Sequence, residues 1–324
     1  MTLTLAIMSV CSPSGGAGTP GPGAAPTTVM VTTSRGEFPL LVYAPLPTAT
    51  RPSAGASQPV QADVPAAGKI GGSGTPASAP SAGAAPSGSS VTPAATRKSE
   101  DSAPGSATSR EKPRQDRPGE GAKPLVLLIS GEGGWRSFDL LLAQILTEAG
   151  YWVGGVDVTK YFREPQDNRR ALAADMRAHA EVLARAAARP AGERVLLAGF
   201  SFGADLAPWI AGDESWRGLA RGLLMIGPDE IGSLEYRLSE ILGFQAKDHI
   251  FSVTEALDSA KGVPTLFIHG GKDSSSASVL LHGRAAAPKK LIVIPDADHH
   301  FSGRTDDLRA ALAEGLAWIE SGRP

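Results

Sequence analysis

The sequence has little cysteine and no long apolar run. Cys11 is the only cysteine among 324 residues, which excludes a disulfide within the chain and a zinc site built on paired cysteines. No stretch approaches the roughly 18 consecutive apolar residues that a membrane-spanning helix needs. The formal net charge is −2. No strong electrostatic field therefore attracts nucleic acid, and we expect no nucleic-acid partner.

The beginning of the chain carries only part of an export signal. Residues 3–10 are apolar, but the basic region that precedes the apolar segment of a secretory signal is missing. The letters SVC are similar to a lipoprotein cleavage site, although Val10 is too large for the position before the cysteine. We interpret residues 1–27 as a degenerate export signal and a disordered tail. An unstructured tail alone is the alternative.

Residues 28–46 and 47–122 differ sharply in composition. The first segment has alternating apolar residues around an SRGE turn, a pattern typical of a β-hairpin. The second is dominated by Ala, Gly, Ser, Pro and Thr, which predicts a disordered insertion or linker. A lone hairpin is marginally stable in water, so we expect it to join the domain that follows. Closing so long a loop adds only about 2.4 kcal/mol. The alternative is a separate peptide and a plain linker.

Residues 123–324 alternate between apolar strands and helical patterns. The pattern predicts strands at 125–130, 151–157, 194–200, 222–228, 264–270 and 289–295, and helices at 137–150, 167–188 and 306–321. Continuous apolar strands that alternate with helices indicate a parallel sheet covered on both faces. With an antiparallel N-terminal hairpin, this is the plan of the α/β-hydrolase fold.

A serine between two glycines follows the strand predicted at 194–200. In AGFSFGAD, Ser201 would lie on the sharp turn between this strand and a helix, where α/β-hydrolases carry their nucleophile. The strand and helix come so close there that residues two positions away must be tiny, as Gly199 and Gly203 are. The alternative for Ser201 is a structural role in a glycine-rich turn.

Candidates for the acid and the base follow Ser201 in the chain order of this fold. Asp273 comes after the strand at 264–270, and the pair His299 and His300 comes after the strand at 289–295. In a triad, the histidine takes the serine proton and the aspartate holds the histidine tautomer. We favour His299 as the base because the first histidine of such a loop usually faces the serine; His300 remains the alternative.

An oxyanion hole needs two backbone N–H groups. One is predicted at Phe202, directly after the nucleophile, and the other in the loop SGEGGW, at Glu132 or Gly133. This loop lacks the G-K-[ST] that would make it a phosphate-binding loop. The sequence predicts neither a metal site nor a cofactor.

Five motifs together resemble the bacterial virulence protein family VirJ/AcvB. They are SGEGGW, GYWVGGVDVTKYF, GFSFGAD, LEYRLSEILG and DADHHF. The similarity covers roughly residues 124–320 and the hairpin, although the family often has Asp in place of Glu132 and an aromatic residue in place of Arg163. The resemblance implies a periplasmic α/β-hydrolase that, like related members, releases the amino acid from aminoacyl-phosphatidylglycerol, notably lysyl-phosphatidylglycerol. It also assigns Ser201 as nucleophile and the two histidines as source of the base.

Other members of this family are linked to type IV secretion, so envelope or secretion-system proteins are expected partners beside a membrane lipid. A lysyl group is doubly cationic, and Glu132, Asp157 and Asp205 are acidic residues near the sheet edge where ligands bind. Tyr161, with the next residue, would pack on the lipid side. The alternatives are that Asp157 caps a turn and that Asp205 bonds locally. For the whole protein, the alternatives are another ester or thioester substrate, or a non-enzymatic binding or chaperone protein.

Overall fold

The computed structural model describes residues 25–46, 123–236 and 248–322, which belong to one compact unit. The predicted insertion at 47–122 and almost all of the predicted export signal lie outside the described residues. The strands are β1 (Thr27–Thr33), β2 (Gly36–Tyr43), β3 (Leu125–Ile129), β4 (Trp152–Val156), β5 (Val195–Phe200), β6 (Ala220–Ile226), β7 (Ile231–Ser233), β8 (Ile250–Ser252), β9 (Thr265–Gly270) and β10 (Lys289–Ile294). The helices are α1 (Ser137–Glu148), α2 (Val158–Tyr161), α3 (Arg169–Ala186), α4 (Phe202–Ala211), the short 3₁₀ helix η1 (Glu214–Trp216), α6 (Val253–Ser259), α7 (Ser278–Arg284) and α8 (Thr305–Ser321).

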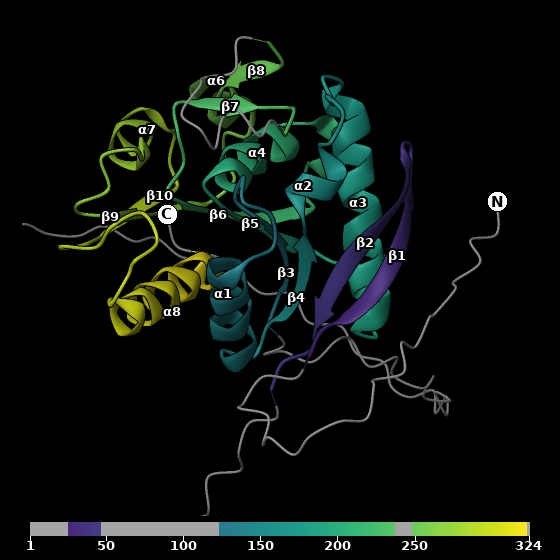
Figure 1. Cartoon of the computed structure of the whole chain (residues 1–324), viewed down its shortest axis with the longest axis horizontal. Helices are drawn as coiled ribbons and strands as arrows, with labels where there is room; N and C mark the ends of the chain where they lie inside the picture. The colour runs from purple at the N-terminus through teal and green to yellow at the C-terminus, as the bar shows by residue number, and fades with distance from the viewer. Residues whose placement is uncertain (1–24, 47–122, 237–247, 323–324) are drawn as a thin grey trace, which may run out of the picture. The chain divides into compact units, whose positions relative to one another are not determined.

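Eight strands form one sheet in the order β1-β2-β4-β3-β5-β6-β9-β10, seen in Figure 1. Strands β1, β2 and β4 pair antiparallel, whereas β4, β3, β5, β6, β9 and β10 run parallel. Parallel strands end at the same edge of a sheet, so the loops after β3, β5, β9 and β10 meet there. The α/β-hydrolase fold predicted from the sequence is confirmed.

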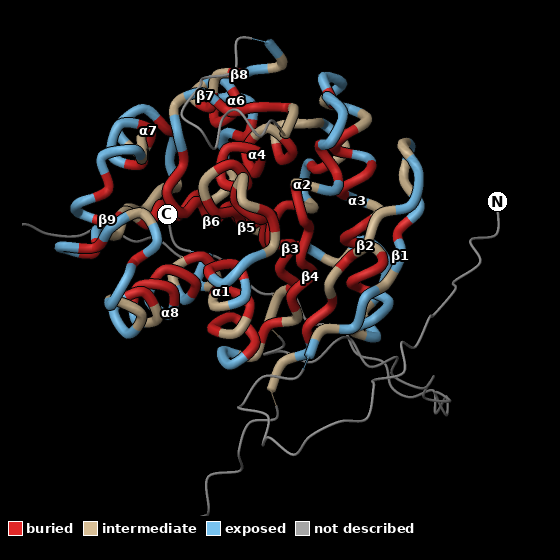
Figure 2. Tube along the Cα trace, in the orientation of Figure 1, coloured by how far each residue is buried: buried red, intermediate tan, exposed pale blue. Residues whose placement is uncertain are grey.

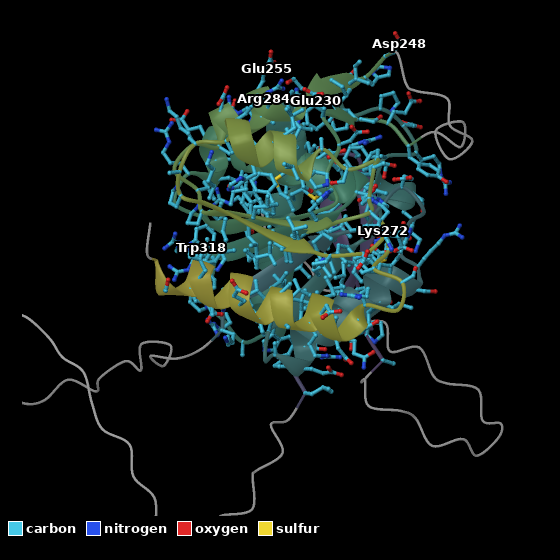
Figure 3. The ribbon with its side chains drawn as sticks, turned by 90° about the vertical axis from the view of Figure 1, so that its left-hand side faces the viewer. Glu230, Asp248, Glu255, Lys272, Arg284 and Trp318 are labelled. Atoms are coloured by element: carbon cyan, nitrogen blue, oxygen red, sulfur yellow. The ribbon has the colours of Figure 1, made fainter. Side chains whose placement is uncertain are left out.

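Helices cover both faces of this sheet. Helices α1 and α8 lie on one face and α3, α4 and α7 on the other (Figure 1), and each face has its own cluster of buried apolar side chains. All five residues of β3 and all six of β5 are buried, as the red central strands of Figure 2 show. In the side view of Figure 3, Trp318 on α8 and Arg284 on α7 lie on opposite sides of the sheet. The two-sided burial explains why the sequence of these strands is continuously apolar.

The N-terminal hairpin is part of the sheet and is tied down at its turn. Strand β2 pairs with β4 from Leu40 opposite Val156 onward. At the turn, the backbone N–H and hydroxyl of Ser34 both donate to the carboxylate of Asp175 on α3, at 2.8 and 2.9 Å. The guanidinium of Arg35 donates to the backbone carbonyl of Tyr161 at 3.1 Å. The expected docking is therefore observed, and a separate peptide is not.

Predicted and observed elements from 125 onward agree within two residues at each end. The pattern did not predict β7, β8, α6 or α7, because segments of three to seven residues are too short to show a clear period. The family motif LEYRLSEILG lies mostly outside the described residues. None of the helices in the described ranges is both long enough and apolar enough to span a bilayer.

Candidate active site

Ser201 lies on the turn between β5 and α4, in a backbone conformation that side chains rarely adopt. Its φ is 50° and its ψ is −120°, a strained combination that costs about 1–3 kcal/mol. The backbone N–H of Ser201 donates to the carbonyl of Ile226 at 2.9 Å, which fixes the turn to β6. This backbone conformation directs the side chain away from the strand at the loop edge of the sheet, as in the nucleophile turn of α/β-hydrolases.

The two flanking glycines give this turn its room. A Cβ on Gly199 would lie 2.1 Å from the backbone carbonyl of Gly203. A Cβ on Gly203 would lie 2.2 Å from the carbonyl oxygen of Ile129 on β3. Both neighbours are backbone atoms, which cannot move aside as a side chain can. The predicted reason for both glycines is therefore observed.

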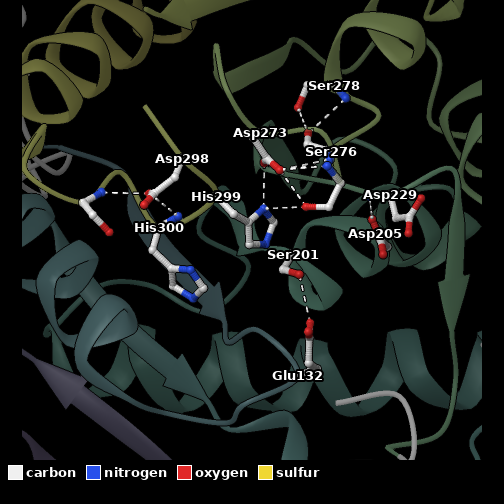
Figure 4. Close-up of polar contacts among 12 residues, drawn as sticks. Glu132, Ser201, Asp205, Asp229, Asp273, Ser276, Ser278, Asp298, His299 and His300 are labelled. Atoms are coloured by element: carbon white, nitrogen blue, oxygen red, sulfur yellow. Dashed lines mark hydrogen bonds and ion pairs between the residues drawn. The ribbon is translucent and has the colours of Figure 1, made fainter. Parts of the chain in front are cut away.

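Asp273 and His299 come together at the edge where Ser201 lies. His299 Nδ1 is 2.7 Å from Asp273 Oδ2, and the imidazole ring lies between that carboxylate and the Ser201 side chain in Figure 4. The Asp273 side chain is only 2% exposed. Burial alone would raise the pKa of Asp273, but hydrogen bonds from Ser275 and His299 hold it below its ordinary value. The ionised carboxylate can therefore hold Nδ1–H and leave Nε2 facing the nucleophile.

His300 has a different environment from His299. It is exposed, and its ring points away from Ser201 in Figure 4. Its ring packs edge-on against Phe138 and Phe200, with centroids 5.8 and 5.3 Å apart. Its backbone N–H donates to Asp298 at 3.0 Å, which shapes the loop. Of the two histidines that the sequence left open, the geometry favours His299.

The Ser201 hydroxyl itself donates to Glu132 rather than to His299. The distance from Ser201 Oγ to Glu132 Oε2 is 2.9 Å, and Figure 4 draws this bond. The sequence predicts the backbone of Glu132 at the oxyanion hole, but it does not predict this side-chain contact. The two residues are 69 positions apart, and the only sequence signal was an acidic residue within a glycine-rich loop.

The loop that carries Glu132 is held by its neighbours. The Trp135 ring packs on Gly155, where an added Cβ would lie only 2.4 Å from Cη2 of the ring. The indole N–H of Trp135 donates to the hydroxyl of Tyr43 at 2.9 Å. Asp139 accepts from the N–H groups of Gly131 and Arg136. The N–H of Gly131 is therefore already bonded, and Glu132 and Gly133 stay the predicted oxyanion donors of this loop.

Asp139 also makes the stability of this loop depend on pH. Its burial raises its pKa from 3.8 to about 6. Because the pKa of the folded state lies above that of the unfolded state, the stabilisation is complete below about pH 4 and is lost as the pH rises through about 6. A shift of this size corresponds to about 3 kcal/mol.

We therefore expect the free energy of unfolding of the wild type, relative to Asp139→Asn, to fall by up to about 3 kcal/mol between pH 4 and pH 7. Urea unfolding of both proteins at the two pH values measures it. The substitution also loses a backbone hydrogen bond, which shifts the difference at both pH values alike. A difference that does not change with pH would contradict the assignment.

Two of the residues predicted to bind substrate are used within the fold. Asp157 caps α2 by accepting the backbone N–H and hydroxyl of Thr159 at 3.1 and 2.7 Å, and it pairs with Lys160. Tyr161 is 1% exposed, and its hydroxyl donates to Asp175 on α3 at 2.6 Å. The structure brings neither side chain to Ser201. The capping alternative considered for Asp157 is the arrangement observed.

Asp205 holds the loop that packs against the His299 ring. It is buried on α4, and its carboxylate accepts the backbone N–H of Asp229 at 2.8 Å. This contact holds the loop after β6, in which Gly227 lies directly against the His299 ring. Burial raises the pKa of Asp205 well above its ordinary value. The bond is not local within α4, since it joins this helix to the loop after β6.

The described residues contain no group of three or more His, Cys, Asp or Glu side chains placed to hold a metal ion. What the site assembles is a hydroxyl on a strained turn, a histidine oriented by a buried carboxylate, and a second carboxylate on the hydroxyl. The hydroxyl, the histidine and the buried carboxylate are the groups used in acyl transfer through a serine.

Comparisons with known proteins show which family model the chain matches and which solved structures it is similar to. The family model described as "Bacterial virulence protein (VirJ)" matches residues 123–318. A comparison with curated protein sequences gave no match. Among solved structures, an α/β serine hydrolase without a lid from Xanthomonas campestris is 16% identical with a TM-score of 0.47, over 91% of this chain and 94% of that one. Est1E from Butyrivibrio proteoclasticus is 16% identical with a TM-score of 0.44, over 61% and 89%. A dienelactone hydrolase from Anabaena variabilis is 19% identical with a TM-score of 0.45, over 61% and 87%.

Proposed function

The chain belongs to the VirJ family of bacterial virulence proteins, and we propose that it is a serine ester hydrolase that removes the aminoacyl group from aminoacyl-phosphatidylglycerol, lysyl-phosphatidylglycerol in particular. The observation that carries the proposal is the contact of 2.7 Å between Asp273 and His299 beside a serine on a strained turn. The family resemblance supports the lipid and a periplasmic site of action at the membrane surface. Envelope or secretion-system proteins are proposed partners on the same ground.

In the proposed reaction, His299 Nε2 takes the hydroxyl proton while Ser201 Oγ attacks the ester carbonyl carbon. The oxyanion that forms is stabilised by the backbone N–H of Phe202 and by that of Glu132 or Gly133. The bond to the glycerol oxygen then breaks, and the leaving alcohol takes the proton from His299. Water, deprotonated by the same histidine, attacks the aminoacyl-serine, and the free amino acid leaves as Ser201 recovers its proton.

The test is lipid hydrolysis. Wild type is incubated with lysyl-phosphatidylglycerol in detergent micelles, with Ser201→Ala as the inactive control, and released lysine is measured together with the remaining lipid. We expect lysine and phosphatidylglycerol to appear in equal amounts with the wild type only. If the wild type releases no lysine, the proposed substrate is wrong.

A non-enzymatic binding protein is the second candidate, because the Ser201 hydroxyl donates to Glu132 and not to the histidine. A fluorophosphonate probe separates the two functions, since it modifies only a serine that its histidine activates. Modification of Ser201 in the folded protein supports the hydrolase, whereas an unmodified Ser201 supports the binding protein.

A further inference from the structure

The Glu132 side chain contacts the nucleophile, and none of the proposed steps of ester hydrolysis uses it. Its Oε2 accepts the Ser201 hydroxyl hydrogen at 2.9 Å (Figure 4). The side chain is half-buried, and the loop that carries it is fixed by Trp135 and Asp139. The carboxylate is thus a built part of the space around the reacting atoms.

A negative charge in this place opposes the hydrolysis of an ordinary ester. The tetrahedral intermediate carries an oxyanion on the carbon that Ser201 attacks, and like charges a few ångströms apart repel strongly in a partly desolvated site. The ester of an uncharged acyl group would therefore react against the field of Glu132. A positive charge on the acyl group, close to the carbonyl, would cancel that repulsion.

Geometry limits where such a positive charge can be. A reacting carbonyl carbon lies about 3–3.5 Å from the attacking oxygen, and the Glu132 carboxylate is within hydrogen-bond distance of that same oxygen. A group bonded to the acyl carbon next to the carbonyl is therefore within reach of Glu132. An ammonium group at that position makes the substrate the ester of an α-amino acid, and it offers three N–H donors.

We propose that the Glu132 carboxylate binds the α-ammonium group of an aminoacyl ester and so selects these esters over plain acyl esters. In the empty site the carboxylate holds the Ser201 hydroxyl. When the ammonium group occupies the carboxylate, the hydroxyl is released to His299 Nε2 and can attack. The inference rests on the proposed ester hydrolysis at Ser201 and assigns the group that recognises the acyl part.

The experiment compares two esters that differ only in the α-ammonium group, alanine ethyl ester and ethyl propanoate. Acid release is followed at about pH 7, where the α-amino group is mostly charged. For Glu132→Gln, we expect the ratio of kcat/KM for the alanine ester to that for the propanoate to fall by roughly 10- to 100-fold, as the loss of a charged hydrogen bond implies. Hydrolysis of the propanoate should become faster, because the repulsion is removed.

Glu214→Gln is the matched control, since Glu214 is an 87% exposed side chain on η1, after the end of α4 remote from Ser201. For this control, we expect the ratio of kcat/KM for the alanine ester to that for the propanoate to equal the wild-type ratio. Fluorophosphonate labelling of Ser201 verifies that each variant is folded. If Glu132→Gln lowers kcat/KM for both esters by the same factor, the ratio is unchanged and the inference is overturned. Glu132 would then act as an auxiliary base for Ser201.

The outcomes also separate this inference from the lipid substrate. Release of lysine from the lipid together with an unchanged ester ratio would leave the proposed function standing and remove the ammonium site. If Glu132→Gln lowers the ester ratio but wild type releases no lysine from the lipid, the ammonium site is supported and the lipid substrate is refuted. If wild type hydrolyses neither soluble ester, although a separate sample reacts with the fluorophosphonate, the inference fails with the esterase activity on which it rests.

Discussion

Ser201→Ala is expected to lower kcat/KM for soluble esters by roughly 10⁴- to 10⁶-fold, the largest effect that any single substitution in this protein should have. The expected reason is that the covalent route through the aminoacyl-serine disappears, and only binding and oxyanion stabilisation remain. Initial rates with alanine ethyl ester measure the effect, and loss of fluorophosphonate labelling places it at this hydroxyl.

Ser215→Ala is the control for this prediction. Ser215 is also a serine at a helix start, where its hydroxyl donates to Asp213 at 2.6 Å on η1, and its loss should leave the rate within about twofold. Thermal unfolding shows whether each variant folds. Removing the strained side chain at 201 is not expected to destabilise the protein. Ester hydrolysis by a folded Ser201→Ala protein at the wild-type rate would refute the nucleophile.

The two histidines should differ by orders of magnitude. His299→Ala is expected to lower kcat/KM by roughly 10³- to 10⁶-fold, because Ser201 loses the base that accepts its proton. His300→Ala is expected to cost less than about tenfold, since its ring packs on Phe138 and Phe200 at the surface. Both variants are measured with the same ester and the same probe.

The pair of variants is its own control, because the same substitution is made at neighbouring positions of one loop. Asp273→Asn should follow His299→Ala in direction, as it removes the charge that the buried contact of 2.7 Å supplies to the ring. A larger loss at His300 than at His299 would show that the loop rearranges when substrate binds and that the base was assigned to the wrong ring.

The family resemblance found in the sequence is confirmed over residues 123–318, and the order of strands and helices is confirmed by the sheet. These features are local or periodic. A run such as LVLLI favours a buried strand, and a serine between two glycines after such a strand is typical of the nucleophile turn. The chain order of Ser201, Asp273 and His299 follows from the same strand pattern.

The roles of acidic side chains could not be derived in this way. Asp157, Asp205 and Glu132 all follow or flank strands at one edge, and the sequence treats them alike. The structure separates them: the first caps a helix, the second joins helix α4 to the loop after β6, and the third accepts the hydroxyl of the nucleophile. Which of these occurs depends on the direction of each side chain relative to segments tens of residues away.

By itself, the sequence determined the fold, the serine turn and the family, because apolar periodicity and short motifs are patterns of residues close together in the chain. Only the tertiary structure decided that His299 rather than His300 meets Asp273, that Tyr161 turns to Asp175, and that Glu132 holds the Ser201 hydroxyl. A hydrogen bond needs its two atoms within about 3 Å, and no pattern along the chain specifies that distance between residues 69 positions apart.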